Sequence, residues 1–263
     1  MSCAGVGAAL AALSGAKSYT YRTASGRTLR IHVFSPPPHE RNAPSVLLFF
    51  GGGWRTGSVS ALADQARAFA GRGYVAGLAD YRVKCRDGTN PLDASVDARA
   101  AYAWWRAHAA RLGADPRRIV LSGGSAGGQL ALMAAQDAPA DEKPAALVLF
   151  NPAVDLVGPA PWYQKLFARS ISPSVLPVDH LPPTIVFHGL ADRRVPIGTV
   201  RAFCRRAAAQ GQTCRIVSYR GQEHGFYHSD RIDPALGRSP YDDTMARAFR
   251  FLDARGITTG NPR

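Results

Sequence analysis

Short apolar runs and longer segments with helical spacing alternate along the chain. Two runs of alternating polarity, residues 19–21 and 29–34, flank a Ser-Gly-Arg turn and predict a β-hairpin. Further strands are predicted at residues 45–50, 74–79, 118–121, 145–150, 184–187 and 215–219. Helices are predicted at residues 61–71, 92–112, 126–136, 196–210 and 241–254. This alternation indicates an α/β fold with a mostly parallel central sheet and helices on both faces.

Residues 153–181 interrupt this rhythm. They are rich in proline and contain Trp162, Tyr163 and Phe167, which predicts a small insertion over the sheet edge. No linker divides the rest, so residues 17–263 are expected to form one domain. Residues 1–16 are small and mildly apolar without a basic start, and are expected to be disordered or the remnant of a signal peptide.

Composition excludes several classes of protein. With 46% hydrophobic and 19% charged residues, the chain resembles neither a disordered protein nor a coiled coil. No apolar run reaches the roughly 18 residues that a membrane-spanning helix needs, so no membrane partner is expected. The net charge is +13, but the basic residues are scattered, so no nucleic-acid partner is expected either. Four cysteines without a CxxC pair give no indication of a metal site.

A glycine-rich turn follows the predicted strand at residues 118–121. Gly123, Ser125 and Gly127 fit the pattern G-x-S-x-G between a strand and a helix, which places a serine hydroxyl above the sheet at a helix N-terminus. The alternatives are a plain small-residue turn or a phosphate-binding loop. A phosphate-binding loop would want a lysine near the helix start, and none is present. The pattern therefore favours a nucleophilic serine.

A second glycine run, residues 51–53, follows the buried strand at 45–50. Backbone N–H groups of Gly52 and Gly53, together with that of Ala126, are suited to bind the oxyanion of a tetrahedral intermediate. A loop that merely needs positive φ angles is the alternative, but two such glycine motifs in one chain favour the catalytic interpretation.

An acid and a base follow two later predicted strands. Asp192 comes after the strand at 184–187 and His224 after the strand at 215–219, which gives the order Ser125, Asp192, His224. A serine needs a base to take its proton, and the base needs an acid to fix its tautomer. Weaker candidates are Asp155 for the acid, and His188 or His228 for the base.

These motifs resemble the α/β-hydrolase superfamily, specifically bacterial serine esterases of the hormone-sensitive-lipase-like and acetyl-xylan- or feruloyl-esterase-like groups. The resemblance runs from about Tyr19 to the C-terminus. It rests on the segments FFGGGWRTG, DYR, SGGSAGG, NPAVDL, HGLADRRVP and GQEHGFY. It implies the α/β-hydrolase fold, Ser125, Asp192 and His224 as a catalytic triad, an oxyanion hole at Gly52, Gly53 and Ala126, and no metal or cofactor.

One position departs from the family. The glycine motif usually begins with a histidine that braces the loop, whereas position 50 is Phe. The segment between Ser125 and Asp192 is also short, so the cap near the active site is expected to be small and the pocket open to short or aromatic acyl groups. Trp54, Trp162 and Tyr163 are the candidates for its walls, although aromatic residues pack cores equally well.

Cys204 and Cys214 lie on a predicted helix and on the strand that follows, and related secreted esterases often carry a disulfide there. A disulfide would imply a periplasmic or secreted protein. The alternative is a pair of reduced thiols in a cytoplasmic enzyme. Cys3 and Cys85 have no evident partner in the sequence.

Together these features predict a serine carboxylesterase acting on short-chain or aromatic acyl esters, with acetyl or feruloyl esters of plant polysaccharides as candidates. The expected partner is a small-molecule or polysaccharide-linked ester, and the sequence gives no indication of the oligomeric state. An amidase, arylformamidase or small peptidase would use the same triad. A hydrolase-like binding protein without activity would be expected to lack part of the site, and no part is missing.

Overall fold

The computed structural model describes residues 10–36, 42–158 and 165–258. Its centre is an eight-stranded sheet with the strand order β1-β2-β4-β3-β5-β6-β7-β8. The strands are β1 (Lys17–Ala24), β2 (Arg27–Phe34), β3 (Ala43–Phe49), β4 (Val75–Ala79), β5 (Ala114–Gly124), β6 (Ala146–Phe150), β7 (Thr184–Gly189) and β8 (Cys214–Tyr219). β2 pairs antiparallel with both β1 and β4, and the other neighbours pair in parallel. The predicted fold class is confirmed.

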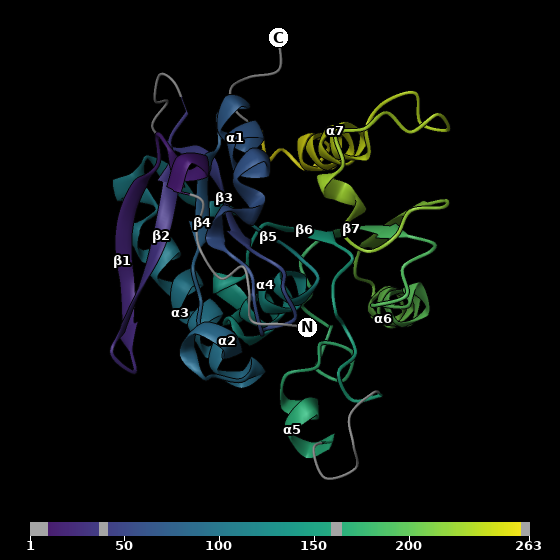
Figure 1. The fold of residues 1–263 in the computed structure, drawn as a ribbon, viewed down its shortest axis with the longest axis horizontal. Coiled ribbons are helices and arrows are strands. Elements are labelled where there is room, and N and C mark those ends of the chain that lie inside the picture. The colour runs from purple at the N-terminus through teal and green to yellow at the C-terminus, as the bar shows by residue number, and fades with distance from the viewer. Residues whose placement is uncertain (1–9, 37–41, 159–164, 259–263) are drawn as a thin grey trace.

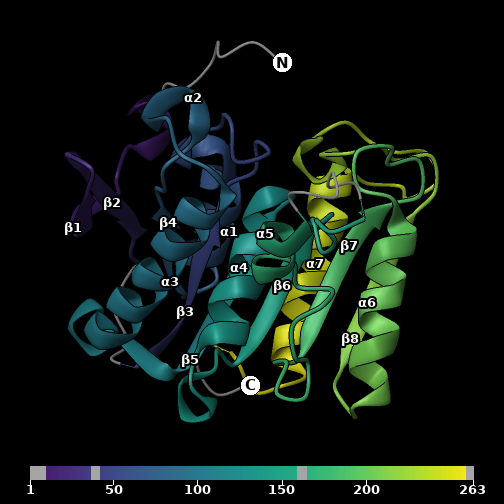
Figure 2. The same cartoon turned by 90° about the horizontal axis from the view of Figure 1, so that it is seen from below.

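Helices cover both faces of this sheet (Figures 1 and 2). They are α1 (Ala63–Gly71), α2 (Lys84–Asp87), α3 (Pro91–His108), α4 (Ala126–Asp137), α5 (Lys165–Ser170), α6 (Ile197–Ala209) and α7 (Pro240–Asp253). α1 and α7 lie on one face, where Phe69 and Phe249 make an edge contact, and α3, α4 and α6 lie on the other. Short 3-10 helices occur at Leu10–Leu13, Val59–Leu62, Ala110–Leu112, Ala140–Glu142 and Phe226–His228.

The central strands are apolar throughout because both of their faces are covered. Every residue of β3, β4, β6 and β7 is buried. The outer strand β8 is half-exposed instead. This gradient from centre to edge bears on the site, because its nucleophile follows a central strand and its base follows the edge strand.

The structure differs from the predicted elements in three places. β5 begins at Ala114, earlier than the predicted strand at 118–121, because Ala114 already pairs with Ala43 on β3, with a register irregularity before the pairing resumes at Ile119. The short helices α2 and α5 were not predicted, since four and six residues carry too little periodicity to detect. Leu10–Leu13 is helical and Leu13 is buried in the core, so the folded part starts before the expected boundary at residue 17.

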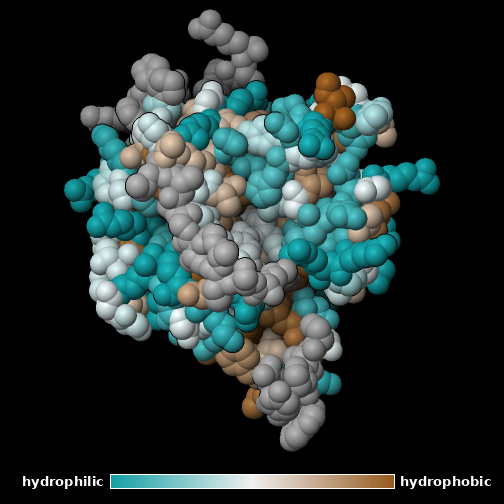
Figure 3. All heavy atoms as spheres, viewed as in Figure 1, coloured by the Kyte–Doolittle hydropathy of each residue, from teal (hydrophilic) through white to brown (hydrophobic). Residues whose placement is uncertain are grey.

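The predicted insertion at 153–181 contains α5 and forms the cap of the molecule, at the bottom of Figure 1. Leu166 and Phe167 on α5 are 83% and 39% exposed. Figure 3 shows apolar side chains gathered over this part of the surface.

Candidate active site

Ser125 occupies a sharp turn between β5 and α4. Its φ angle of 54° and ψ angle of −118° are unusual for a residue with a side chain, and neighbouring contacts hold it there. A Cβ atom at Gly123 would lie 2.4 Å from the Gly127 carbonyl oxygen, and one at Gly127 would lie 2.0 Å from the Phe49 carbonyl oxygen. The two glycines of G-x-S-x-G are therefore required because the turn packs directly on β3.

Three side chains from distant positions in the sequence meet at this turn. His224 Nε2 lies 2.9 Å from Ser125 Oγ, and His224 Nδ1 lies 2.8 Å from Asp192 Oδ2. The Asp192 side chain is fully buried, whereas that of His224 is 17% exposed. The three residues follow β5, β7 and β8, so the carboxyl ends of parallel strands bring them to one edge of the sheet.

Backbone groups hold the Asp192 carboxylate. Its Oδ1 accepts hydrogen bonds from the N–H groups of Arg194 and Val195, both at 2.9 Å, which leaves Oδ2 for the imidazole. With Oδ2 accepting from Nδ1–H, the bare Nε2 of His224 faces the Ser125 hydroxyl. This is the tautomer that accepts a proton from serine.

Two of the three expected oxyanion donors line the same cavity as Ser125, and the third follows it directly in the sequence. Gly52 and Gly53 line the cavity into which Ser125 opens. Ala126 is the first residue of α4, so its N–H belongs to the helix turn that has no intrahelical acceptor. Gly52 has a φ angle of +132°, and a Cβ atom there would lie 2.1 Å from the Thr56 carbonyl oxygen, so only glycine fits.

Phe50, at the position where the family has histidine, is buried beneath this loop. Its ring stacks on Tyr81 with centroids 4.0 Å apart, and the Tyr81 hydroxyl donates a 2.7 Å hydrogen bond to the Phe50 carbonyl oxygen. Burial raises the pKa of Tyr81 well above its usual value, so the hydroxyl stays protonated as a donor. Aromatic stacking and one hydrogen bond thus fix the start of the glycine loop.

Gln129, one turn into α4, fixes the end of the loop. It is fully buried, and its Oε1 accepts a 3.0 Å hydrogen bond from Trp54 Nε1. Its Nε2 donates to the Ile171 carbonyl oxygen at 2.8 Å, which links the cap to the same side chain. Trp54 has a φ angle of 58°, so this contact holds a residue in an uncommon conformation beside the oxyanion glycines.

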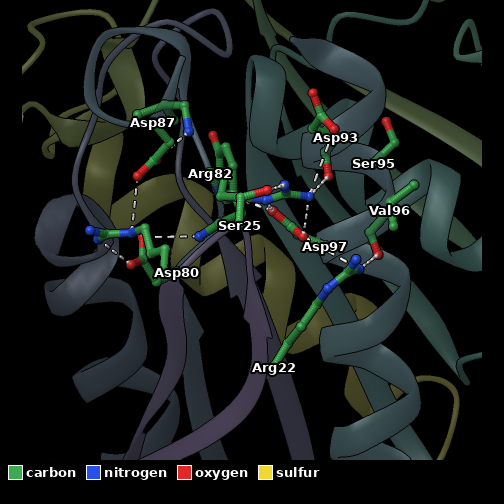
Figure 4. Close-up of polar contacts among 12 residues, drawn as sticks. Arg22, Ser25, Asp80, Arg82, Asp87, Asp93, Ser95, Val96 and Asp97 are labelled. Atoms are coloured by element: carbon green, nitrogen blue, oxygen red, sulfur yellow. Dashed lines mark hydrogen bonds and ion pairs between the residues drawn. The ribbon is translucent and has the colours of Figure 1, made fainter. Parts of the chain in front are cut away.

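Buried ion pairs support the segment that carries Tyr81. Arg82 forms a bidentate pair with Asp97 on α3, at 2.8 and 3.0 Å, and Asp97 is fully buried (Figure 4). On the other side of Tyr81, Asp80 pairs with Arg27 and Arg86. Breaking such a buried pair from one side is costly, because the remaining charge stays buried. The network therefore holds in place the segment of Tyr81, on which the start of the glycine loop rests.

Ser125 and His224 open on a cavity of about 1200 Å³. Of the three predicted wall residues, Trp54 lines this cavity, and Trp162 and Tyr163 lie outside the described residues. Phe167 and Ile171 of the cap and Tyr227 also line it, and Arg193 and Arg194 come from the loop after β7.

The weaker candidates from the sequence take other positions. Asp155 lines the cavity, but its carboxylate accepts hydrogen bonds from the N–H groups of Val157 and Gly158. His188 is fully buried. Its Nε2 forms a hydrogen bond with the Val195 carbonyl oxygen and lies 3.5 Å from Asp192 Oδ2. His228 lines the cavity beside the Tyr227 ring. Burial lowers the pKa of both histidines, and both contact residues other than Ser125.

Cys204 on α6 and Cys214 on β8 form a disulfide with Cα atoms 5.1 Å apart. Cys85, which has no evident partner in the sequence, is also disulfide-bonded. Across the described part of the chain, no helix is long and apolar enough to cross a membrane. The same residues contain no group of three or more His, Cys, Asp or Glu side chains arranged to hold a metal ion.

Comparisons with known proteins agree with this architecture. The BD-FAE family model matches residues 31–151. Carboxylesterase NlhH of Mycobacterium tuberculosis is 37% identical over 108 residues, which cover 40% of this chain and 33% of that protein. The probable carboxylic ester hydrolase LipM of the same organism is 29% identical over 210 residues, covering 68% of this chain and 48% of LipM. The match thus spans one third to one half of these curated relatives.

A solved structure covers nearly the whole chain. Propionate-bound Est2, a thermophilic esterase of Thermogutta terrifontis, is 32% identical with a TM-score of 0.82, over 95% of this chain and 98% of the other. The chain belongs to the bacterial esterases of the α/β-hydrolase superfamily. Its fold is the one that the resemblance in the sequence implied.

Some functional residues of this α/β-hydrolase had no assigned role in the sequence analysis. Gln129 is detectable as a polar residue in the otherwise apolar helix α4, but nothing in the sequence reveals that it contacts Trp54. Tyr81 is part of the DYR motif, yet its contact with the Phe50 carbonyl depends on the fold. Arg193 and Arg194 stand in the HGLADRRVP motif directly after the acid, without any signal that both line the cavity.

Proposed function

We propose that this α/β-hydrolase is a serine carboxylesterase that hydrolyses short-chain or aromatic acyl esters through an acyl-enzyme on Ser125. The observation that carries the proposal is the hydrogen-bonded chain from Ser125 through His224 to Asp192, which opens on the cavity of about 1200 Å³. Isolated serine hydroxyls are weak nucleophiles, and this chain supplies the base that activates one.

In the proposed reaction, His224 Nε2 takes the proton of Ser125 Oγ as the oxygen attacks the ester carbonyl. The N–H groups of Gly52, Gly53 and Ala126 stabilise the oxyanion, and Asp192 stabilises the imidazolium. His224 then gives the proton to the leaving alkoxide, which departs as the alcohol. A water molecule, deprotonated by His224, attacks the acyl-enzyme, and the carboxylic acid leaves as Ser125 regains its proton.

Two features support small acyl groups. Structures of the related Est2 are described as propionate-bound and butyrate-bound, and these ligands are short-chain acids. The cap contributes only the short helix α5 among the described residues, with Phe167 and Ile171 on the cavity wall. Aromatic walls at Trp54 and Phe167 also favour an aromatic acyl group such as feruloyl, and acetyl and feruloyl esters of plant polysaccharide are the proposed natural candidates.

The decisive experiment compares the wild type with Ser125→Ala on p-nitrophenyl acetate and butyrate. We expect the substitution to lower kcat by a factor on the order of 10⁴ or more while thermal unfolding stays unchanged. Labelling of the wild type by a fluorophosphonate probe, absent in the variant, identifies the nucleophile directly. Retained turnover or retained labelling in Ser125→Ala would refute the assignment.

A panel of substrates then resolves the reaction class. Chromogenic esters of increasing chain length, acetylated xylan and methyl ferulate define the acyl preference. Each ester is paired with its matching amide, because an amidase or arylformamidase would use the same three residues. Faster turnover of the amide would replace the esterase proposal with the amidase.

We also propose that the protein works in an oxidising compartment, the periplasm or the exterior of the cell. The disulfide between Cys204 and Cys214 and the disulfide-bonded Cys85 support this, because cytoplasmic thiols are kept reduced. Alkylation of intact cells followed by mass spectrometry reads the oxidation state. Alkylated Cys204 and Cys214 in cells of the source organism would contradict the proposal.

A further inference from the structure

Cationic residues line the active-site cavity and a second cavity that shares part of its wall. Arg193 and Arg194 line the cavity itself. A second cavity of about 650 Å³ adjoins it, sharing the wall residues Trp54 and Phe167, and is lined by Arg55 and Lys84. Among the described residues that line these two cavities, Asp155 is the one with a carboxylate.

These cations are not needed to balance charge within the protein. Among the described residues, neither Arg193 nor Arg194 has a carboxylate within ion-pair distance. The Asp155 carboxylate accepts hydrogen bonds at Oδ1 from the backbone N–H groups of Val157 and Gly158, and no ion pair joins it to either arginine among the described residues. Two guanidinium groups therefore remain available to a ligand in the cavity.

Neither arginine serves the catalytic acid through its side chain. Arg194 contacts Asp192 through its backbone N–H, a contact that any residue except proline provides. A side chain of either charge would keep this loop soluble. Both consecutive residues, Arg193 and Arg194, are instead positively charged and line the same cavity as Ser125 and His224. Guanidinium groups match the planar geometry of a carboxylate and can bind it through two parallel charge-assisted hydrogen bonds.

We propose that the preferred ester substrates carry a carboxylate, which Arg193 and Arg194 bind while the ester carbonyl lies at Ser125. This inference rests on the proposed esterase function and deepens it, since it names the class of substrate. The net charge of +13 would add long-range attraction for such anions.

The test compares ester pairs of similar size that differ in charge. Mono-4-nitrophenyl glutarate against 4-nitrophenyl pentanoate places the carboxylate on the acyl part. 4-Acetoxybenzoate against 4-acetoxybenzamide places it on the alcohol part. For each pair the ratio of kcat/KM is measured for the wild type and for Arg193→Gln/Arg194→Gln. We expect the variant to lower the ratio about tenfold in at least one pair, as for the loss of a charge-assisted hydrogen bond.

The control variant Arg111→Gln/Arg205→Gln removes two exposed arginines that do not line either cavity, so the net charge falls equally. Its ratios should match the wild type. Raising the salt concentration should shrink the wild-type preference and leave that of the Arg193→Gln/Arg194→Gln variant nearly unchanged. Circular dichroism and thermal unfolding verify that both variants are folded.

The outcomes separate this inference from the proposed function. Turnover of the neutral esters with ratios that are the same in wild type and Arg193→Gln/Arg194→Gln overturns the carboxylate preference and leaves the esterase intact. Equal losses in the two double variants also overturn it, because the effect would then come from net charge alone. Absence of turnover of every ester by the wild type overturns the esterase function and this inference with it.

Discussion

The two sides of the active site are held in place by different means. Ser125 follows β5 at the centre of the sheet, where a turn of glycines packs against the backbone of β3. Asp192 follows the buried strand β7, and His224 follows the half-exposed edge strand β8, which a disulfide joins to α6. Steric packing thus positions the nucleophile, whereas backbone hydrogen bonds hold the acid, and a disulfide joins the strand before the base to α6.

The strongest test of the central side is Gly127→Ala. The new Cβ atom would lie 2.0 Å from the Phe49 carbonyl oxygen and 2.4 Å from the Phe50 carbonyl oxygen, and both belong to buried backbone. We expect the free energy of unfolding to fall by about 3 kcal/mol or more, measured by urea denaturation. Gly71→Ala is the matched control, because nothing lies within 4 Å of a Cβ atom there. Equal stabilities of the two variants would contradict the steric account.

The edge side is tested by Cys204→Ala/Cys214→Ala. The disulfide spans 10 positions of the sequence, and closing a loop of that size stabilises a protein by about 2–3 kcal/mol. We expect that loss in urea denaturation, accompanied by a lower kcat, since the helix and strand that it joins carry the loops of the acid and the base. A variant as stable and active as the wild type would show that the edge needs no covalent brace.

Gly189→Ala probes the contact between the two loops at the edge. A Cβ atom at Gly189 would lie 2.2 Å from the Gln222 carbonyl oxygen, in the loop that leads to His224. Because Gln222 lies in a partly exposed loop, whereas Gly127 packs on the backbone of a buried strand, we expect a smaller loss, about 1–2 kcal/mol, with kcat reduced about tenfold. Gly198→Ala on α6, where a Cβ atom meets nothing within 4 Å, is the control. A loss as large as that of Gly127→Ala would erase the distinction between centre and edge.

The smallest expected effect concerns Trp54 and Gln129. Trp54→Phe removes the indole N–H, and Gln129→Met removes its acceptor. A double-mutant cycle on kcat/KM should give a coupling energy of about 1 kcal/mol, the typical net worth of one hydrogen bond. Additive effects would mean that the contact does not position the glycine loop. Tyr81→Phe, which removes the hydroxyl from the Phe50 carbonyl, is a comparison at the other end of the same loop.

The sequence predicted the parts of the molecule whose physics is local. Continuous apolar runs identify strands buried on both faces, such as β3 and β6, and the glycine spacing around Ser125 follows from contacts within one strand–turn–helix unit. Apart from the triad, which the order of the motifs indicates, contacts between distant segments were not predictable. The stacking of Phe50 on Tyr81 and the bond from Trp54 to Gln129 depend on how three layers pack. The predicted pocket walls at Trp162 and Tyr163 remain predictions.

The order of the strands also has a consequence for how the protein behaves at high concentration. Within the described residues, the sheet ends in β1 on one side and β8 on the other, and each leaves backbone N–H and C=O groups without a neighbouring strand. Such edge strands can pair with a strand of another molecule, and exposed positive charges oppose this pairing. Lys17 is exposed on β1 and Arg215 is exposed on β8. The positive charges of two copies that approach through their edge strands would therefore repel each other. The charges on the two edge strands therefore oppose aggregation through the sheet edges.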